Sequence, residues 1–145
     1  MSKKCLAICC EAISPNMLNY VKDGLQALPK SHKACIKTSK CKKYCSIQLD
    51  GGFCTSGTFD YLIICYDRQN TQCIALEIHP ADTSEVTTIK QKFHRTEKCR
   101  KKHNCQNWDY YWVPPRRKGI SIKKDSRKWK ELAQLGIQIR RQVEI

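Results

Sequence analysis

The clearest pattern of apolar and polar positions lies in the middle of the chain, where two adjoining strands are predicted. Residues 61–66 form a continuous apolar run, which is typical of a buried central strand. Residues 71–79 alternate, so that successive side chains point to opposite faces of a strand. The polar segment 68–70 between them is long enough for a hairpin turn. We therefore expect an antiparallel pair of strands at the centre of the fold.

Polar side chains suited to metal chemistry gather at one end of this hairpin. Asp60 directly precedes the first strand. Glu77 and His79 project from the same face near the end of the second strand, which Pro80 stops. The beginning of one strand and the end of its antiparallel neighbour lie at the same edge of a sheet. The three side chains could therefore converge on one ion.

Three helices and three further strands complete the expected fold. The helices begin at Ser14-Pro15, at Asp82 and at Ser126, and the strands cover residues 44–49, 108–113 and 137–145. Hairpins at the front and helical crossovers behind favour an α/β fold with a mixed central β-sheet of about five strands flanked by helices. No linker divides the sequence, so we expect a single domain over 1–145, with the helix and strand of 126–145 completing the sheet.

Two of the helices carry specific packing expectations. One face of the first helix is formed by Leu18, Val21, Leu25 and Leu28. In the second helix, Asp82 with Glu85 three residues later resembles a capping box. The face of this helix that packs on the sheet includes one lysine, and consists of Val86, Ile89, Lys90 and Phe93.

The charge balance bounds the class of partner. The chain has 27 Lys and Arg residues against 13 Asp and Glu, a formal net charge of +14. Such an excess favours a polyanion, with nucleic acid ahead of an acidic membrane surface; a merely solubilising surface is the alternative. No apolar run approaches the length of a membrane helix, so we expect no membrane partner. A protein partner and the oligomeric state stay open.

Three basic patches are expected to contact phosphates. Their residues are Lys37, Lys40, Lys42, Lys43, Arg100, Lys101, Lys102, Arg116 and Arg117. They belong to no helix-turn-helix, paired zinc finger or RNA-stacking signature. The predicted contact is therefore with the phosphate backbone, dependent on salt and tolerant of sequence.

Eleven cysteines make the chain cysteine-rich, and the number is odd. Secreted disulfide scaffolds are usually shorter and carry an even number. Glu11 interrupts the short apolar stretch near the N-terminus, so we expect no signal peptide. We interpret the cysteines as reduced thiols in a cytoplasmic, reducing compartment. A protein delivered into the cytosol of another cell would have the same composition.

Zinc is a second possible use of the cysteines. Two sets could in principle hold it: Cys35, Cys41, Cys45 and Cys54, or Cys99, His103 and Cys105 with a further partner. The chain contains no Cys-x-x-Cys, and paired knuckles are what identify a zinc module. Cys65 and Cys73 lie in apolar strands and are expected to be ordinary core residues. We therefore expect no structural zinc, and no cysteine lies in a signature for a catalytic nucleophile.

The element order and two short motifs resemble the PD-(D/E)XK nuclease superfamily. In that superfamily an Asp opens the second core strand after a glycine-containing turn. The third strand carries Glu-x-Lys, whose Lys can be replaced or can migrate to the following helix. Gly57-Thr58-Phe59-Asp60 stands at the first place and Glu77-Ile78-His79 at the second. The resemblance covers residues 14–113 and implies a restriction-endonuclease-like core.

A divalent metal site follows from both the residues and the resemblance. Mg²⁺ or Mn²⁺ needs hard oxygen ligands, which Asp60, Glu77 and the backbone carbonyl of Ile78 could supply. Such an ion polarises a phosphodiester and lowers the pKa of a bound water. Taken singly, Asp60 is equally a turn residue. A carboxylate among apolar neighbours, such as Glu77, is costly to bury without a partner.

The sequence departs from the superfamily at His79, where the usual residue is Lys. His79 could ligate Mn²⁺, act as a general base, or replace the lysine imperfectly. Lys90 is the candidate for a lysine that has migrated to the helix, although it could also be a solvated side chain. Glu11 is a candidate for the additional acid that some members carry. Without either cation at the site, the fold would be catalytically dead.

Two functions from different classes remain open. The first is a metal-dependent nuclease that cleaves the phosphodiester bonds of DNA or RNA, with Asp60, Glu77, His79 and Lys90 at its site. The second is a non-catalytic basic module on the same fold that binds nucleic acid or a protein. The sequence favours neither DNA nor RNA, and neither single nor double strands.

Overall fold

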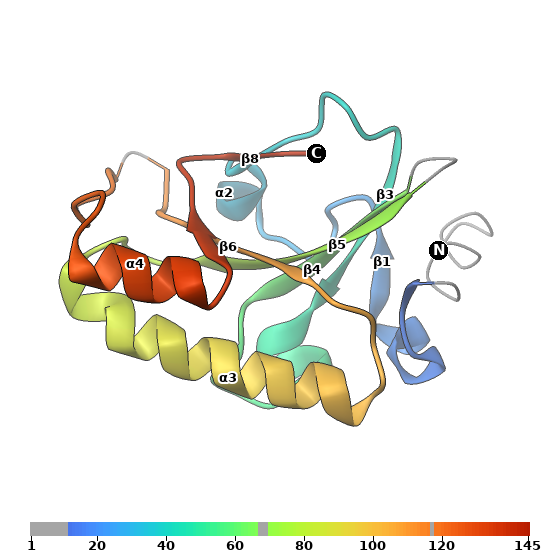
Figure 1. Cartoon of the computed structure of the whole chain (residues 1–145). Coiled ribbons are helices and arrows are strands. Elements are labelled where there is room, and N and C mark those ends of the chain that lie inside the picture. Colours follow the sequence, from blue (N-terminus) through green and yellow to red (C-terminus); the bar gives the residue numbers. More distant parts are fainter. Residues whose placement is uncertain (1–11, 67–69, 117) are drawn as a thin grey trace.

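A mixed β-sheet of six strands organises the chain, whose computed structural model describes residues 12–66, 70–116 and 118–145 (Figure 1). The strands lie in the order β1-β3-β4-β5-β6-β7. Their bounds are Val21–Asp23 (β1), Lys43–Gln48 (β3), Tyr61–Tyr66 (β4), Thr71–Ile78 (β5), Asp109–Val113 (β6) and Ile137–Ile139 (β7). The predicted α/β class is confirmed, with a sheet one strand larger than expected.

The predicted central hairpin is present. β4 and β5 pair antiparallel, with Tyr61 opposite Leu76 and Tyr66 opposite Thr71. β3 pairs antiparallel with the other side of β4, so β4 is an interior strand. The side chains of Leu62, Ile63 and Ile64 are fully buried, as the continuous apolar run of β4 predicts.

Two helical crossovers build the parallel half of the sheet. Helix α3 (Val86–Lys102) connects β5 to β6, and helix α4 (Arg127–Gln134) connects β6 to β7. Both helices cover the same face of the sheet (Figure 1). Val86, Ile89 and Phe93 lie on the buried face of α3, as their spacing predicts. Ser126 caps α4, because its hydroxyl accepts a hydrogen bond of 3.2 Å from the backbone N–H of Trp129.

Smaller elements cover the opposite face. Helix α2 (Lys30–Lys33) precedes β2 (Ile36–Lys37), which pairs in parallel with β8 (Val143–Glu144) at the end of the chain. Their apolar residues, together with those of β4, β5 and β6, form a second core cluster. The sheet is therefore covered on both faces, and its strand ends are where polar groups can gather.

The predicted first helix is wrong. Its start at Ser14 is right, but a 3₁₀ turn, η1 (Pro15–Tyr20), gives way at once to strand β1. Gly24 adopts φ +54°, a left-handed conformation that ends β1 and does not fit a continuing helix. Val21 packs in the cluster under α3, whereas Leu25 and Leu28 pack on the opposite face of the sheet. Residues spaced for one helical face therefore serve two layers.

Two finer predictions are also wrong. The carboxylate of Asp82 makes no capping hydrogen bond and instead accepts one of 2.7 Å from the hydroxyl of Ser121, so no capping box forms. The predicted final strand over 137–145 is two strands, β7 in the main sheet and β8 in the small one. Apolar spacing of two predicts strands, but it does not reveal that the chain changes sheets between them.

Two disulfides overturn the predicted reducing compartment. Cys41 is bonded to Cys65 and Cys54 to Cys99, each pair with a Cα–Cα distance of 6.2 Å. Cys65 is therefore not the ordinary core residue that its apolar strand predicted. Disulfides persist in oxidising environments, so the cytoplasmic assignment is wrong and the pairing points to an oxidising compartment. The odd number of cysteines argued against disulfides in the sequence, although it does not prevent four of the cysteines from pairing.

Candidate functional site

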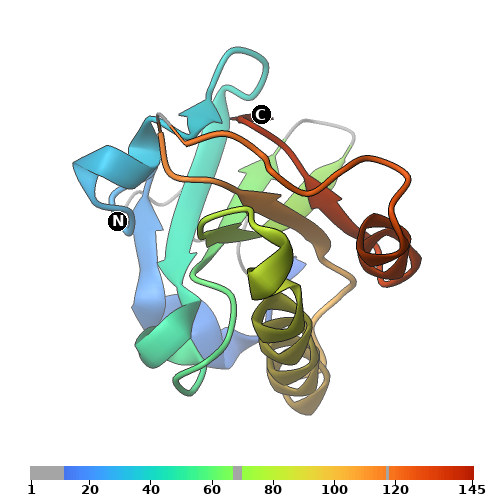
Figure 2. The ribbon, with the colours of Figure 1, turned by 90° about the vertical axis from the view of Figure 1, so that its left-hand side faces the viewer.

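Asp60 and Glu77 face each other at one edge of the sheet. The register that pairs Tyr61 with Leu76 places Asp60 directly opposite Glu77, one residue beyond the end of the ladder. Asp60 Oδ2 accepts a hydrogen bond of 3.0 Å from the backbone N–H of Ile78. In Figure 2, which faces this edge, the beginning of α3, the helical turn η2 (Leu49–Phe53) and residues 114–116 and 118–120 lie around the strand ends. The convergence predicted for these two carboxylates is thus present.

The Glu77 carboxylate is buried and incompletely hydrogen-bonded. Its side chain is 1% exposed. One oxygen, Oε1, lies 2.6 Å from the ammonium nitrogen of Lys92. The other, Oε2, has no hydrogen-bond partner, and among the described residues only Trp108 Nε1 shares that condition. A buried acceptor without a donor is costly, so Glu77 indicates a requirement that this chain's own residues leave unmet.

Like charges surround Glu77. Burial, and then the neighbouring carboxylate of Asp60, raise the pKa of Glu77 to about 8, although the hydrogen bond from Lys92 opposes them. Burial also raises the pKa of Asp60, and the nearby Asp50 adds to that rise. Asp50 comes from η2, where its Oδ1 accepts a hydrogen bond of 2.8 Å from the backbone N–H of Gly57. Three carboxyl groups thus share one ammonium group, an arrangement that an added cation would relieve.

Lys92, and not Lys90, is the lysine of α3 that reaches the carboxylates. The Lys90 ammonium lies 3.4 Å from Glu131 Oε2 on α4, on the other flank of the helix. The structure therefore places the Lys90 ammonium at Glu131, and the migrated lysine stays a prediction. Both residues flank the buried stripe of Ile89 and Phe93, and the sequence does not reveal which flank faces β4.

His79 is held beside the cluster by an acid that the sequence did not single out for this role. Its Nε2 lies 2.7 Å from Glu85 Oε2, and its Nδ1 lies 3.9 Å from Glu77 Oε1. The side chain of His79 is 26% exposed, so it is open to solvent as well as to Glu77. Glu85 stands at the end of η3 (Thr83–Glu85), which follows the end of β5 closely enough for the contact. An imidazole oriented by a carboxylate is a usual arrangement for a general base.

The segment that leads to Asp60 is bonded to α3 at two points and approaches it closely at a third. The disulfide joins Cys54 to Cys99. The backbone N–H of Phe59 donates a hydrogen bond of 2.8 Å to the hydroxyl of Thr96. Gly57 adopts φ +89°, and a Cβ there would lie 2.5 Å from a guanidinium nitrogen of Arg95. Helix α3 therefore positions Asp60 through this segment and supplies Lys92 directly.

The residues present fit a divalent ion of the Mg²⁺ type. Within the described ranges, no group of three or more His, Cys, Asp or Glu side chains is placed to hold a metal ion. Mg²⁺ usually binds through one or two carboxylates, with waters and substrate phosphates completing its shell. Asp60 and Glu77 meet that requirement, and the partnerless Oε2 atom supplies a donor. The Ile78 carbonyl as a third ligand stays a prediction, and Glu11 lies outside the described residues.

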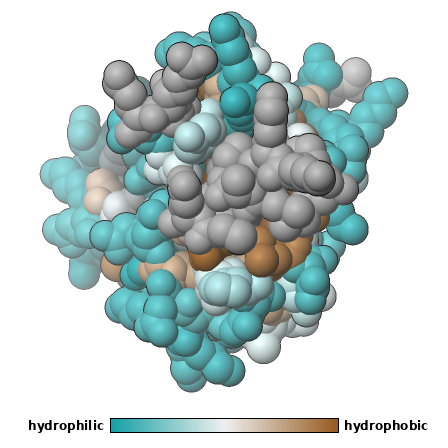
Figure 3. Space-filling model, turned by 90° about the vertical axis from the view of Figure 1, so that its right-hand side faces the viewer, coloured by the Kyte–Doolittle hydropathy of each residue, from teal (hydrophilic) through white to brown (hydrophobic). Residues whose placement is uncertain are grey.

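The predicted phosphate-contacting residues have different surroundings. Most are exposed, namely Lys37, Lys40, Lys42, Lys43, Lys101, Lys102 and Arg116. Arg100 is buried and donates to both carboxylate oxygens of Glu97, so its guanidinium group stabilises the fold and is not exposed to a phosphate. Arg117 lies outside the described residues. In Figure 3, hydrophilic side chains cover the periphery of the visible face, and apolar side chains gather near its centre, beside the residues drawn in grey.

Neither cysteine set suggested for zinc is intact. Cys41 and Cys54 of the first set, and Cys99 of the second, are in disulfides. Cys35, Cys45, Cys73 and Cys105 are buried.

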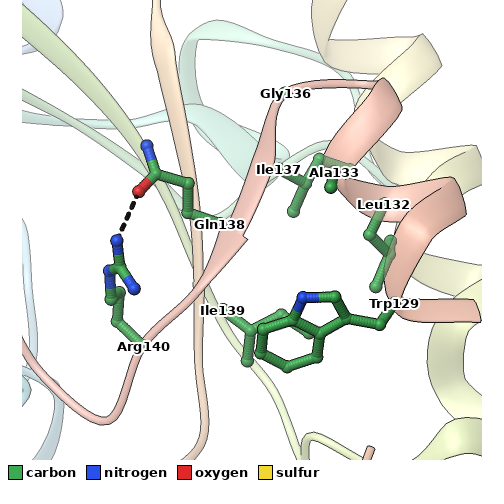
Figure 4. Close-up of a pocket in the computed structure, with 8 residues that line it drawn as sticks. All are labelled: Trp129, Leu132, Ala133, Gly136, Ile137, Gln138, Ile139 and Arg140. Carbon is green, nitrogen blue, oxygen red and sulfur yellow. Dashed lines mark hydrogen bonds between the residues drawn. The ribbon is translucent and has the colours of Figure 1, made fainter. Parts of the chain in front are cut away.

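An apolar pocket of about 380 Å³ lies between α4 and β7 (Figure 4). Trp129 and Leu132 of α4 face Ile137 and Ile139 of β7 across it. None of its lining residues belongs to the carboxylate cluster.

Comparisons of the chain with protein-family models, with curated proteins and with solved structures found no match. In the described part of the chain, none of the helices combines the length and the apolar character that a membrane span needs. Function is therefore inferred from the chemistry of the site itself.

Proposed function

We propose that this protein is a metal-dependent nuclease in which Asp60 and Glu77 hold Mg²⁺ or Mn²⁺ at the edge of the sheet. The observation that carries the proposal is the buried Glu77 carboxylate, whose Oε2 has no hydrogen-bond partner, directly opposite a second carboxylate. A chain rarely keeps such an arrangement unless a ligand completes it. The net charge of +14 adds a reason to expect a phosphate-bearing substrate.

Each side chain has a defined part in this proposal. When bound, the metal ion would polarise the phosphodiester and lower the pKa of an attacking water. Lys92 would hold Glu77 in place through its 2.6 Å contact and supply positive charge near the developing phosphorane. His79, oriented by Glu85, would accept the proton of the water. Exposed lysines would hold the nucleic-acid backbone.

The resemblance to PD-(D/E)XK nucleases supports the proposal in part. The hairpin β4–β5, the helix α3 and the parallel strand β6 follow one another as that core requires. Asp60 opens β4, Glu77 lies near the end of β5, and Lys92 replaces the lysine absent from Glu-x-His. The place of the first helix is taken by η1 and β1, which departs from the expected core.

A cleavage assay tests the proposal. Plasmid, single-stranded DNA and total RNA would be incubated with Mg²⁺, Mn²⁺ or EDTA, using wild-type protein beside Glu77→Gln. The matched control is Glu131→Gln, which removes a carboxylate from the half-exposed pair with Lys90. We expect cleavage that needs the metal, falls about a hundredfold or more in Glu77→Gln, and is unchanged in Glu131→Gln.

The competing function is a non-catalytic nucleic-acid-binding or protein-interaction module. The contact between Lys92 and Glu77 favours this second function, because the ammonium group already offsets part of the buried charge without a metal ion. Salt-sensitive binding without cleavage in any metal, equal in wild type and Glu77→Gln, would replace the nuclease proposal with this one.

A further inference from the structure

A basic pocket lies at the same edge of the sheet as the candidate metal site and shares no lining residue with it. Its volume is about 470 Å³. It is lined by the end of the α2 segment, by the loop after β6 and by the turn between β7 and β8. The residues used below are Cys35, Pro114, Arg116, Lys118, Arg141 and Gln142.

The charge of this pocket has a single sign. Arg116, Lys118 and Arg141 line it, and none of its lining residues is an Asp or Glu. In the described ranges, no ion-pair partner is found for any of the three. Three unpaired cations around one concavity attract an anion, and two of them are arginines, whose planar fork suits phosphate oxygens.

The walls of the pocket are tied together by hydrogen bonds. The amide of Gln142 donates one of 3.2 Å to the carbonyl of Ala34, and the backbone N–H of Val143 donates one of 3.0 Å to the carbonyl of Cys35. The backbone N–H of Lys118 donates one of 3.0 Å to the carbonyl of Pro115, and the thiol of Cys35 donates one of 3.9 Å to the carbonyl of Pro114 in the same loop. The cations therefore stand on connected backbone segments from three parts of the chain.

The pocket and the carboxylate cluster share one edge of the sheet. The backbone N–H of His79 donates a hydrogen bond of 3.1 Å to the carbonyl of Val113, and the next residue, Pro114, lines the pocket. After the pocket the chain returns to the β5 end, because the backbone N–H of Ser121 donates to the carbonyl of Ala81 at 3.0 Å. One extended polyanion could thus contact both places.

We propose that Arg116, Lys118 and Arg141 form a subsite for a phosphate group of the nucleic acid whose scissile bond lies at Asp60 and Glu77. This inference rests on the proposed nuclease function and deepens it. The group is either a terminal monophosphate or an internal phosphodiester of the strand, since both present the same anionic oxygens. In this proposal the carboxylate cluster acts on the scissile phosphate, and the positively charged pocket at the same edge positions the strand.

Binding measured without cleavage tests the subsite. Fluorescence anisotropy would follow short labelled DNA and RNA oligonucleotides, each with a 5′-phosphate or a 5′-hydroxyl, in EDTA over a range of salt. The pocket variant is Arg116→Gln with Arg141→Gln. The control is Lys22→Gln with Lys98→Gln, which removes the same charge from exposed positions on β1 and α3. A charge-preserving variant, Arg116→Lys with Arg141→Lys, and thermal unfolding of every variant show whether the fold is kept.

We expect the pocket variant to bind about tenfold or more weakly than the control, and its log–log salt slope to fall by about 1.4. If the subsite takes a terminal phosphate, removing the 5′-phosphate costs wild type the same factor. If it takes an internal phosphate, the pocket variant binds the 5′-phosphate and the 5′-hydroxyl oligonucleotides more weakly than wild type by the same factor. Equal weakening in the pocket and control variants would overturn the subsite.

Failure of this inference is distinguishable from failure of the nuclease proposal. Cleavage that depends on Glu77, together with equal weakening in pocket and control variants, removes only the subsite. Selective weakening in the pocket variant, with no cleavage in any metal, keeps a phosphate site on a binding module.

Discussion

Helix α3 brings together two acidic side chains whose surroundings are opposite in kind: Glu77, which is buried, and Glu97, which is partly buried. Glu97, on the helix, has partners for both oxygens: Arg100 contacts each of them, and Tyr110 donates its hydroxyl to Oε2 at 2.7 Å. Burial raises the pKa of Glu97, but these hydrogen bonds outweigh it, and the net shift is downward. Glu77, beneath the same helix, has one lysine, a partnerless oxygen and a pKa raised to about 8.

The difference teaches how to separate a structural acid from a functional one. Burial alone does not, because Glu97 is also partly removed from water, with 22% of its side chain exposed. What separates them is whether the protein's own donors complete the group. Glu97 is complete and fixes the end of α3 against β6, through Arg100 and Tyr110. Glu77 is incomplete, and its deficit lies where a second carboxylate, a lysine and a histidine also meet.

Removing the cation from the complete pair should give the largest effect. Arg100→Met leaves Glu97 with Tyr110 as its remaining partner and takes a donor from the carbonyl of Cys105. We expect the free energy of unfolding to fall by about 3 kcal/mol, because a partly buried charge is left without its partner. Urea unfolding of wild type and variant measures this. A loss similar to that of an exposed control such as Lys98→Met would contradict the comparison.

Removing the cation from the incomplete pair should act on activity instead. In Lys92→Met, the protonated and neutral form of Glu77, which burial already favours, needs no cation beside it, so we expect only a small loss of stability. Cleavage should fall about a hundredfold, equivalent to about 2.7 kcal/mol of barrier. Lys90→Met, two residues away, is the matched control and should keep wild-type cleavage. If Lys90→Met is the damaging variant, the assignment of Lys92 is wrong.

The raised pKa of Glu77 predicts an unusual dependence of stability on pH. The folded protein holds the Glu77 proton up to about pH 8, whereas the unfolded chain releases it near its ordinary value of 4.5. This contribution to stability is thus full below about 4.5 and is lost as pH rises toward 8. In EDTA, the free energy of unfolding of wild type should fall over that range relative to that of Glu77→Gln. For Glu97 the sign is reversed: its contribution is lost as pH falls below the ordinary value. Parallel profiles for wild type and Glu77→Gln would contradict the assignment.

A divalent cation should increase the free energy of unfolding by binding at Glu77, and not at the other carboxylates. At neutral pH, Mg²⁺ or Mn²⁺ at ten times its dissociation constant should stabilise wild type by about 1.4 kcal/mol. EDTA should remove the effect, and Glu77→Gln should lack it, while Glu131→Gln should keep it. Differential scanning calorimetry checks all four cases. Equal shifts in Glu77→Gln and wild type would place the cation elsewhere.

The part of this picture that the sequence predicts is local. The apolar run of β4, the alternation in β5 and the antiparallel turn between them suffice to bring Asp60 opposite Glu77. A periodic stripe predicts α3 and its buried face. These features depend on neighbours in sequence, for which strand and helix periods are reliable signals.

What the sequence does not predict depends on layers and flanks. The spacing of Val21 and Leu25 fits a helix, but Val21 pairs with β3 as a strand residue. Pairing between strands that are distant in sequence therefore overrides the local helical period. Lys90 and Lys92 both flank the same stripe, and only the position of α4 decides between them. The pairing of four cysteines among eleven likewise depends on spatial proximity, which spacing alone does not determine.

The disulfide between Cys54 and Cys99 has a consequence in terms of reciprocal linkage. It closes a separation of 45 residues, which in the chain-entropy description stabilises the fold by about 4 kcal/mol. It also holds the segment that leads to Asp60 against α3, and so favours the arrangement that a cation at Glu77 would need. By thermodynamic necessity, occupancy of that site must then protect the disulfide to the same degree. Resistance of this bridge to reduction should therefore rise with the concentration of divalent cation, so that the redox state of the protein would report on the proposed metal site.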